Sequence, residues 1–221
     1  MKRVYIISVI LLICFSGMVL AVDNTAKIEQ NGDQQIARFG QEGIGNEVYI
    51  IQGLTFAESN EAYVYQNGDG NKVYIDQYVY KNIADIFQEG DRNTVDISQR
   101  GSNNECTLEQ INNDNTFVCS QDGVGNLIKG LDGDSYLTLE FNKDKPAVQF
   151  DGANFTGIQK GWNNKIGLYQ GNGYSARIEQ YLGNKKALLY QTGGPDHYVE
   201  IIQYGAYPWF GDPSPCIKVF K

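Results

Sequence analysis

The sequence predicts an all-β fold, a two-sided β-solenoid of stacked strand-turn-strand rungs, with about 22 residues per rung and about eight rungs. One observation is a row of glutamines spaced eleven residues apart. A second is an asparagine five residues after many of these glutamines, and a third is apolar-polar alternation from each asparagine to the next glutamine. A fixed period of this kind is the signature of a repeat architecture.

The glutamines keep their spacing over most of the chain, with slips of one residue near the C-terminus. They are Gln30, Gln41, Gln52, Gln66, Gln77, Gln88, Gln99, Gln110, Gln121, Gln159, Gln170, Gln180, Gln191 and Gln203. The asparagines that open the strands are Asn46, Asn60, Asn71, Asn82, Asn93, Asn104, Asn115, Asn126 and Asn164. We predict that both sets form the core ladder of a self-assembling stack.

Each strand is predicted between an asparagine and the next glutamine, because apolar and polar residues alternate there with period two. In residues 71–77 the inward side chains are expected to be Asn71, Val73, Ile75 and Gln77. The four residues after each glutamine are rich in Gly, Asp and Asn, which supply the positive φ values of a sharp reversal. Two strands and two turns make one rung, and successive rungs should stack about 4.8 Å apart.

The amide side chains at both ends of each strand are predicted to lie inside, although burying a polar group without a partner is unfavourable. Stacking supplies the partners, because each amide can donate to the copy above and accept from the copy below. The alternative is that these residues are exposed polar strand ends. Their strict spacing relative to the inward apolar positions favours the ladder.

Residues 1–21 are predicted to be a signal peptide, with Lys2 and Arg3 ahead of an apolar run and cleavage after Ala21. An uncleaved membrane anchor is the alternative. Removing Lys2 and Arg3 from the 18 basic residues leaves 16 against 26 acidic residues, a net charge of −10. Nucleic acid is therefore not expected as a partner, because phosphate binding needs a basic patch.

Residues 22–204 are predicted to form the repeat solenoid. Within it, residues 131–148 break the register, and Asp132 stands where a glutamine is expected. Counting strands near Asp132 and Phe141 as degenerate repeats keeps the total near eight rungs. Residues 205–221 carry three of the five prolines, which indicates a tail or a cap.

No catalytic, cofactor-binding or metal site is predicted, and we expect the protein not to be an enzyme. His197 is the only histidine, so the chain cannot assemble a histidine-based metal cluster or triad. Residues 67–71 and 132–134 resemble fragments of calcium loops. The sixth and twelfth positions of such loops do not hold the required glycine and acid, however, and turn chemistry explains both segments better.

Three cysteines remain after processing, too few for a disulfide scaffold. Folding residues 115–121 back over residues 104–110 should place Cys106 opposite Cys119. In an exported protein these two could form a disulfide, or they could stay buried as free thiols, and the sequence leaves both open.

The segments 66–71, 88–93 and 121–126 read Gln-Asn-Gly-Asp-Gly-Asn, Gln-Glu-Gly-Asp-Arg-Asn and Gln-Asp-Gly-Val-Gly-Asn, and they resemble the curlin repeat. The resemblance covers about residues 26–204. It implies a subunit, major or nucleating, of curli, the extracellular amyloid fibres of Gram-negative biofilms that mediate cell adhesion. It further implies export through a dedicated outer-membrane pore with accessory proteins, and polymerisation at the cell surface with itself and other curlin subunits.

Two functions of other classes compete with this one. A monomeric β-solenoid could bind a saccharide or another surface, but an ice binder would show regular outward threonine rows, whereas Thr94, Thr107 and Thr116 are scattered. An enzyme of the polysaccharide-lyase type would need a cluster of acids and bases that the pattern does not provide. The outward tyrosines could serve fibre packing or adhesion, or could reflect strand propensity alone.

Overall fold

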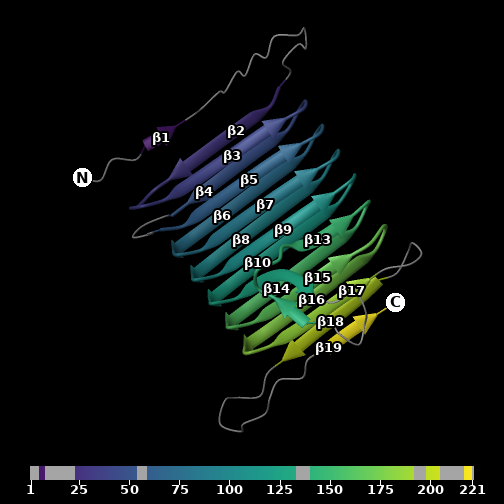
Figure 1. The fold of residues 1–221 in the computed structure, drawn as a ribbon. Coiled ribbons are helices and arrows are strands. Elements are labelled where there is room, and N and C mark those ends of the chain that lie inside the picture. The colour runs from purple at the N-terminus through teal and green to yellow at the C-terminus, as the bar shows by residue number, and fades with distance from the viewer. Residues whose placement is uncertain are drawn as a thin grey trace.

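The computed structural model of the chain describes residues 5–7, 23–53, 59–132, 140–191, 198–204 and 217–220, and these residues form two facing β-sheets without a helix (Figure 1). The first sheet runs in the order β1 (Tyr5–Ile7), β2 (Thr25–Gln30), β4 (Glu47–Gln52), β6 (Lys72–Tyr80), β8 (Thr94–Ser102), β10 (Thr116–Val124), β14 (Asn154–Trp162), β16 (Ser175–Gly183) and β18 (Tyr198–Tyr204). All of its neighbours are parallel except β1 and β2, which are antiparallel.

The second sheet stacks the strands that alternate with these along the chain. They are β3 (Ile36–Glu42), β5 (Glu61–Asn67), β7 (Ile83–Glu89), β9 (Glu105–Ile111), β11 (Leu127–Asp132), β13 (Ala147–Phe150), β15 (Lys165–Gln170), β17 (Lys186–Gln191) and β19 (Ile217–Phe220), with the short β12 (Glu140–Asn142) attached to β11. In the regular turns, each strand of one sheet is followed by a turn, which we call an arc, and then by a strand of the other sheet that runs back.

The stacking register places each residue on its counterpart one turn later. Val73 lies beside Val95 and Gln77 beside Gln99, a separation of 22 residues. The described residues build about seven turns, close to the eight rungs expected from the glutamine count. The predicted two-sided β-solenoid is therefore confirmed, and strand pairing between identical positions fixes which side chains meet along the axis.

The core between the two sheets consists of the predicted inward residues. Val73, Val95 and Ile97 are fully buried, and so are the amides that bracket them, Asn71 and Gln77. The alternation arises because successive strand residues point to opposite faces of a sheet, and only one face of each sheet meets the other sheet. The half-buried strands inferred from period two are confirmed.

One turn of the second sheet is built from two separate pieces of chain. β11 pairs with the first residues of β9, and β13 pairs with its last residues, so β11 and β13 share one level of the stack. Between them the chain makes an excursion in which β12 returns antiparallel to β11. Strands do lie near Asp132 and Phe141, as predicted, because β11 ends at Asp132 and β12 contains Phe141. They do not add two repeats to the stack, however, since β11 shares its level with β13 and β12 pairs antiparallel with β11.

Both ends of the chain contribute a strand to the stack. β1 pairs with β2 at the N-terminal end of the first sheet, and β19 pairs with β17 at the C-terminal end of the second. The predicted signal peptide otherwise lies outside the described residues, as do residues 205–216 of the predicted tail. Within the described part of the chain, no helix is long and apolar enough to cross a membrane.

Candidate self-assembly core

The predicted glutamines form two continuous rows of hydrogen bonds along the solenoid axis. In each row the side-chain nitrogen of one glutamine donates to the side-chain oxygen of the glutamine in the next turn, at 2.7–3.0 Å. The row of the first sheet comprises Gln30, Gln52, Gln77, Gln99, Gln121, Gln159, Gln180 and Gln203. The row of the second sheet comprises Gln41, Gln66, Gln88, Gln110, Gln149, Gln170 and Gln191.

Every glutamine of the two rows except Gln30 and Gln191 also links the two sheets by a hydrogen bond to the backbone. The second amide hydrogen of Gln99, for example, reaches across to the backbone carbonyl of Ile83, at 2.9 Å. Ile83 begins the preceding strand of the other sheet, and the same contact recurs sixteen residues back from Gln41, Gln52, Gln77 and Gln121. A buried primary amide has two donors and an oxygen to satisfy, and this arrangement satisfies all three.

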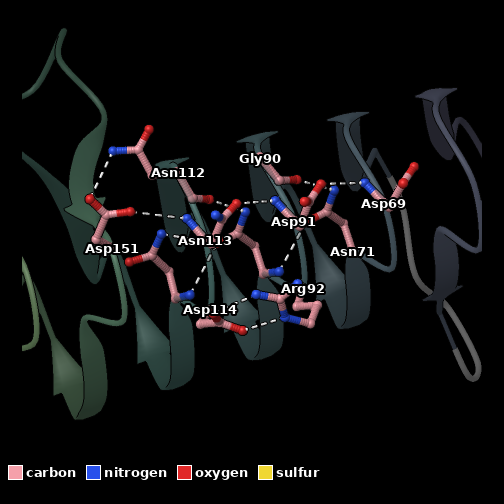
Figure 2. A network of polar contacts seen from close by, with 11 residues as sticks. Asp69, Asn71, Gly90, Asp91, Arg92, Asn112, Asn113, Asp114 and Asp151 are labelled. Carbon is pink, nitrogen blue, oxygen red and sulfur yellow. Dashed lines mark hydrogen bonds and ion pairs between the residues drawn. The ribbon is translucent and has the colours of Figure 1, made fainter.

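The asparagines form the expected side-chain ladder in part: the side-chain nitrogens of Asn82, Asn104, Asn115 and Asn126 each donate to the side-chain oxygen of the asparagine one turn earlier, at 2.9–3.1 Å. The asparagines also bind the backbone. Their side-chain oxygen accepts the backbone N–H of the strand-opening residue one turn later, as when Asn71 Oδ1 accepts from Asn93 N at 2.9 Å. Their side-chain nitrogen donates to an arc carbonyl, as from Asn71 to Gly90 at 2.7 Å (Figure 2). Glutamines therefore link like side chains, whereas asparagines mainly supply hydrogen bonds to arc backbone that would otherwise be buried and unpaired.

Gln149 is a member of the second row that the sequence pattern missed. It accepts from Gln110 and donates to Gln170, so it occupies the level at which Asp132 was expected to replace a glutamine. The signal was present, because Gln149 lies 21 residues before Gln170 and ends a short alternating segment. Counting forward from Gln121 missed it, since the excursion adds residues inside a strand rather than in an arc.

Among the described residues, four strand-opening positions lack asparagine. Gln35 is one of them, in the first turn, at the place that Asn60 takes in the next. Ala153, Tyr174 and Lys185 occupy the other three in the C-terminal turns, and all three are buried. Their backbone still enters the asparagine network, because Ala153 N donates to Asn115 and Lys185 N donates to Asn164. The asparagine network is thus complete in the central turns and ends in the last turns, whereas the glutamine rows continue.

The glutamine rows have a direction. Every side-chain nitrogen donates toward the C-terminal end, so oxygens face the N-terminal end and nitrogens face the C-terminal end. Among the described residues, the rows begin at Gln30 and Gln41. At the other end, Gln191 is fully buried and its side-chain nitrogen has no hydrogen-bond partner among the described residues. The two ends of the solenoid therefore differ in hydrogen-bonding character.

The arcs that join the second sheet to the first carry a ladder of their own (Figure 2). The Asp69 carboxylate accepts the backbone N–H of Ile44, and Asp91 accepts that of Asp69, at 2.8 and 2.9 Å. Asn113 and Asp151 continue the pattern in the following turns. Each of these side chains satisfies an arc N–H that strand pairing does not reach.

Cys106 and Cys119 lie side by side in the core, where both are buried and free. Burial, and then a hydrogen bond with Cys106, raise the pKa of the Cys119 thiol well above its ordinary value. The two side chains therefore face each other as the fold-back required. The disulfide is not formed in this structure, and whether it forms in the exported protein stays a prediction.

We expect protein recovered from an oxidising compartment to contain a Cys106–Cys119 disulfide that closes a loop of about thirteen residues and adds on the order of 3 kcal/mol to the free energy of unfolding. Peptide mapping without reductant would detect the linked peptides, and urea unfolding with and without reductant would measure the gain. A Cys106→Ser variant should show no response to reductant. Linkage of either cysteine to Cys216 would contradict the pairing.

Several carboxyls on the outward faces of the sheets are only partly solvated. Burial raises the pKa values of Asp76, Asp85, Asp96 and Glu109, and the neighbouring charge of Asp96 raises that of Asp76 further. Asp114 behaves in the opposite way, because its hydrogen bonds with Arg92 lower the pKa of its carboxyl. Asp76 and Asp96 are diagonal neighbours on adjacent strands, because Asp76 pairs with Ser98 and Asp96 pairs with Tyr74.

Mild acidification is expected to stabilise the fold. A raised folded-state pKa means that the folded state binds more protons, so stability is gained as pH falls toward the ordinary carboxyl pKa values of about 4. Below that range the groups with lowered pKa values, such as Asp114, reverse the trend. Urea unfolding across this pH window should show the gain, and an Asp76→Asn/Asp96→Asn variant should reduce it. If the free energy of unfolding of that variant rose with falling pH as much as that of the wild type, Asp76 and Asp96 would not be the source of the gain.

Within the described residues, no group of three or more His, Cys, Asp or Glu side chains could hold a metal ion. No curated protein and no solved structure matches the chain. The family model of the curlin associated repeat matches residues 23–53, 57–78, 82–111 and 90–123, which correspond to the regular turns from β2 to β10. The regular turns from β2 to β10, through which the glutamine rows run, are therefore curlin associated repeats.

Proposed function

We propose that this protein is a secreted, non-enzymatic structural subunit that polymerises end to end into extracellular curli-type amyloid fibres of a biofilm matrix. The observation that carries the proposal is the pair of directional glutamine rows. Acceptor oxygens face one end of the solenoid and donor nitrogens face the other. A second molecule stacked head to tail continues a row, whereas a head-to-head contact opposes oxygen to oxygen.

Unpaired strand edges provide the templates for this addition. β18 is the last strand of the first sheet, and β3 is the first strand of the second. An edge strand presents a line of backbone N–H and C=O groups that can pair with another chain. Cleavage of the predicted signal peptide would remove β1 and expose the edge of β2 as well, so that processing prepares the N-terminal end for growth.

The curlin associated repeats support the remaining parts of the proposal. We infer that the chain crosses the outer membrane of a Gram-negative bacterium through a curli-type secretion pore with accessory proteins. It then joins copies of itself and other curlin subunits at the cell surface, where the fibres mediate adhesion. The acidic net charge would limit premature association during export, because like-charged chains repel one another.

The test is fibre growth by the purified protein. We expect thioflavin-binding fibres with a reflection near 4.8 Å, and growth that is seeded by preformed fibres. Inhibition of fibre growth should also be directional. A fragment in which only the C-terminal end of the solenoid can pair should block one end of a fibre and leave the other end growing. Protein that stays monomeric under these conditions, yet binds a saccharide surface, would overturn the proposal in favour of a monomeric binding solenoid.

A further inference from the structure

The two long edges of the solenoid, each made by one set of arcs, carry opposite charge. We call the edge formed by the arcs that leave the second sheet the acidic edge. Its charged residues among those described are Glu42, Asp69, Glu89, Asp91, Asp114 and Asp151, against the single cation Arg92. Six acids and one base give this edge a net charge of −5.

The opposite edge is basic and apolar from Tyr78 onward, and we call it the basic edge. Its described cations are the exposed Lys81, Arg100 and Lys160 and the buried Lys185, against the acid Asp122; Asp33 lies in the first arc, ahead of this stretch. Its arcs also hold five of the exposed large hydrophobic side chains of the molecule. They are Val79, Tyr80, Val124, Trp162 and Leu182.

These apolar side chains line up along the axis. Tyr80, Val124 and Trp162 occupy the same column of the first sheet, and they are 45%, 48% and 41% exposed. The buried Ser102 lies in this column between Tyr80 and Val124. Val79 and Leu182 share the adjacent column, which glycines occupy in the turns between. An aligned row of exposed apolar groups, flanked by cations, is the composition of an interaction surface rather than of scattered surface residues.

We propose that the basic edge of one solenoid binds the acidic edge of a second copy, so that neighbouring filaments associate side by side. The inference rests on the proposed function, because it concerns how fibres bundle once they exist. The partner is a second copy of this chain, since its acidic edge supplies the complementary charge with the same repeat along the axis. Because both edges repeat at the spacing of strands in a sheet, every turn of one filament can meet a turn of the other.

Repetition makes the contact effective. A single exposed ion pair contributes little, but a filament presents the same pair many times, and linked weak contacts act together. The net charge of −10 on the processed chain acts against any such association, because uniformly charged filaments repel. If the two edges are complementary, removing an acid from the acidic edge should weaken bundling. If only general charge repulsion acts, removing the same acid should strengthen bundling.

The test compares two variants that each lose two negative charges. Glu42→Gln/Glu89→Gln removes two exposed acids of the acidic edge that take no part in the arc ladder. Asp96→Asn/Glu109→Gln neutralises the outward faces instead. We would count filaments per bundle by electron microscopy and measure thioflavin growth rates separately, at salt concentrations from about 0.1 M to 1 M, where the screening length falls from about 10 Å to 3 Å.

We expect wild-type bundles to separate into single filaments at high salt. The acidic-edge variant should lose its bundles already at low salt while its growth rate is unchanged, and the face variant should bundle at least as well as wild type. Equal or greater bundling by the acidic-edge variant overturns the edge contact but leaves the proposed function intact. If no fibres form, the proposed function fails, and sedimentation of the soluble protein then tests the edge contact. A salt-sensitive dimer that only the acidic-edge variant loses supports the edge contact. A wild-type protein that is monomeric in low salt overturns it.

Discussion

Replacing Gly68 by alanine should disrupt the stack at the arc between β5 and β6. Gly68 has a φ of +121°, a conformation that residues with a side chain rarely adopt. A Cβ there would lie 2.1 Å from the carbonyl oxygen of Gly90 in the next turn. Because that oxygen also accepts a hydrogen bond from Asn71, it cannot move aside without breaking the asparagine network. We expect a loss on the order of 3 kcal/mol or more in the free energy of unfolding, and slow polymerisation.

Gly70→Ala in the same arc is the matched control. Gly70 also has a positive φ, +68°, but it lies in the left-handed region, and the nearest atom to its Cβ position is a side-chain carbon of Arg92 at 3.8 Å. Its loss should be about 1–2 kcal/mol, the ordinary cost of that conformation. Urea unfolding of both variants would compare them. Equal losses would show that backbone conformation, and not the approach of the next turn, sets the requirement for glycine.

Gln99→Ala should have the second large effect, because it breaks a glutamine row in the middle. Gln99 accepts from Gln77 and donates to Gln121 and to the Ile83 carbonyl. Each buried group left without its partner costs about 1–3 kcal/mol, and the missing side chain also leaves a cavity. We expect strongly retarded fibre growth and a lower urea midpoint for dissolving the fibres that do form.

The control for this prediction must be an outward residue without structural contacts of its own. Thr94→Ala meets that condition better than Glu105→Ala, because Glu105 pairs at 2.5 Å with Lys129, whose side chain is 7% exposed. Removing one member of such a shielded pair strands the other charge. If Thr94→Ala slows growth as much as Gln99→Ala, the glutamine rows do not govern assembly.

The regular turns could be predicted from the sequence because each level repeats the same residue types at the same spacing. Asn93, Val95, Ile97 and Gln99 are inward in the structure for the reason that period two gives: alternate side chains face the opposite sheet. The facing position of Cys106 and Cys119 followed from the same register, because the fold-back pairs positions counted outward from one arc.

The sequence predicted less where residues that are adjacent in the stack are not 22 residues apart in the chain. Gln149 joins the row 39 residues after Gln110, and no local pattern reveals that β11 and β13 share a level. Alternation likewise predicts that Lys129 and Leu188 face solvent, yet both are buried. They lie in the part of the second sheet where β12 packs against β15, so the excursion, and not the strand period, decides their environment.

The split level has a practical consequence for adding new segments to this molecule. The chain leaves the second sheet after β11 and re-enters it at β13, while the hydrogen bonds from Gln110 through Gln149 to Gln170 continue at 3.0 and 2.9 Å. Lengthening such a connection costs little, about 0.6 kcal/mol for each doubling of its length. The exposed turn at residues 143–145, between β12 and β13, is thus a natural entry point for a foreign peptide, which would be displayed once per subunit at regular intervals along a fibre.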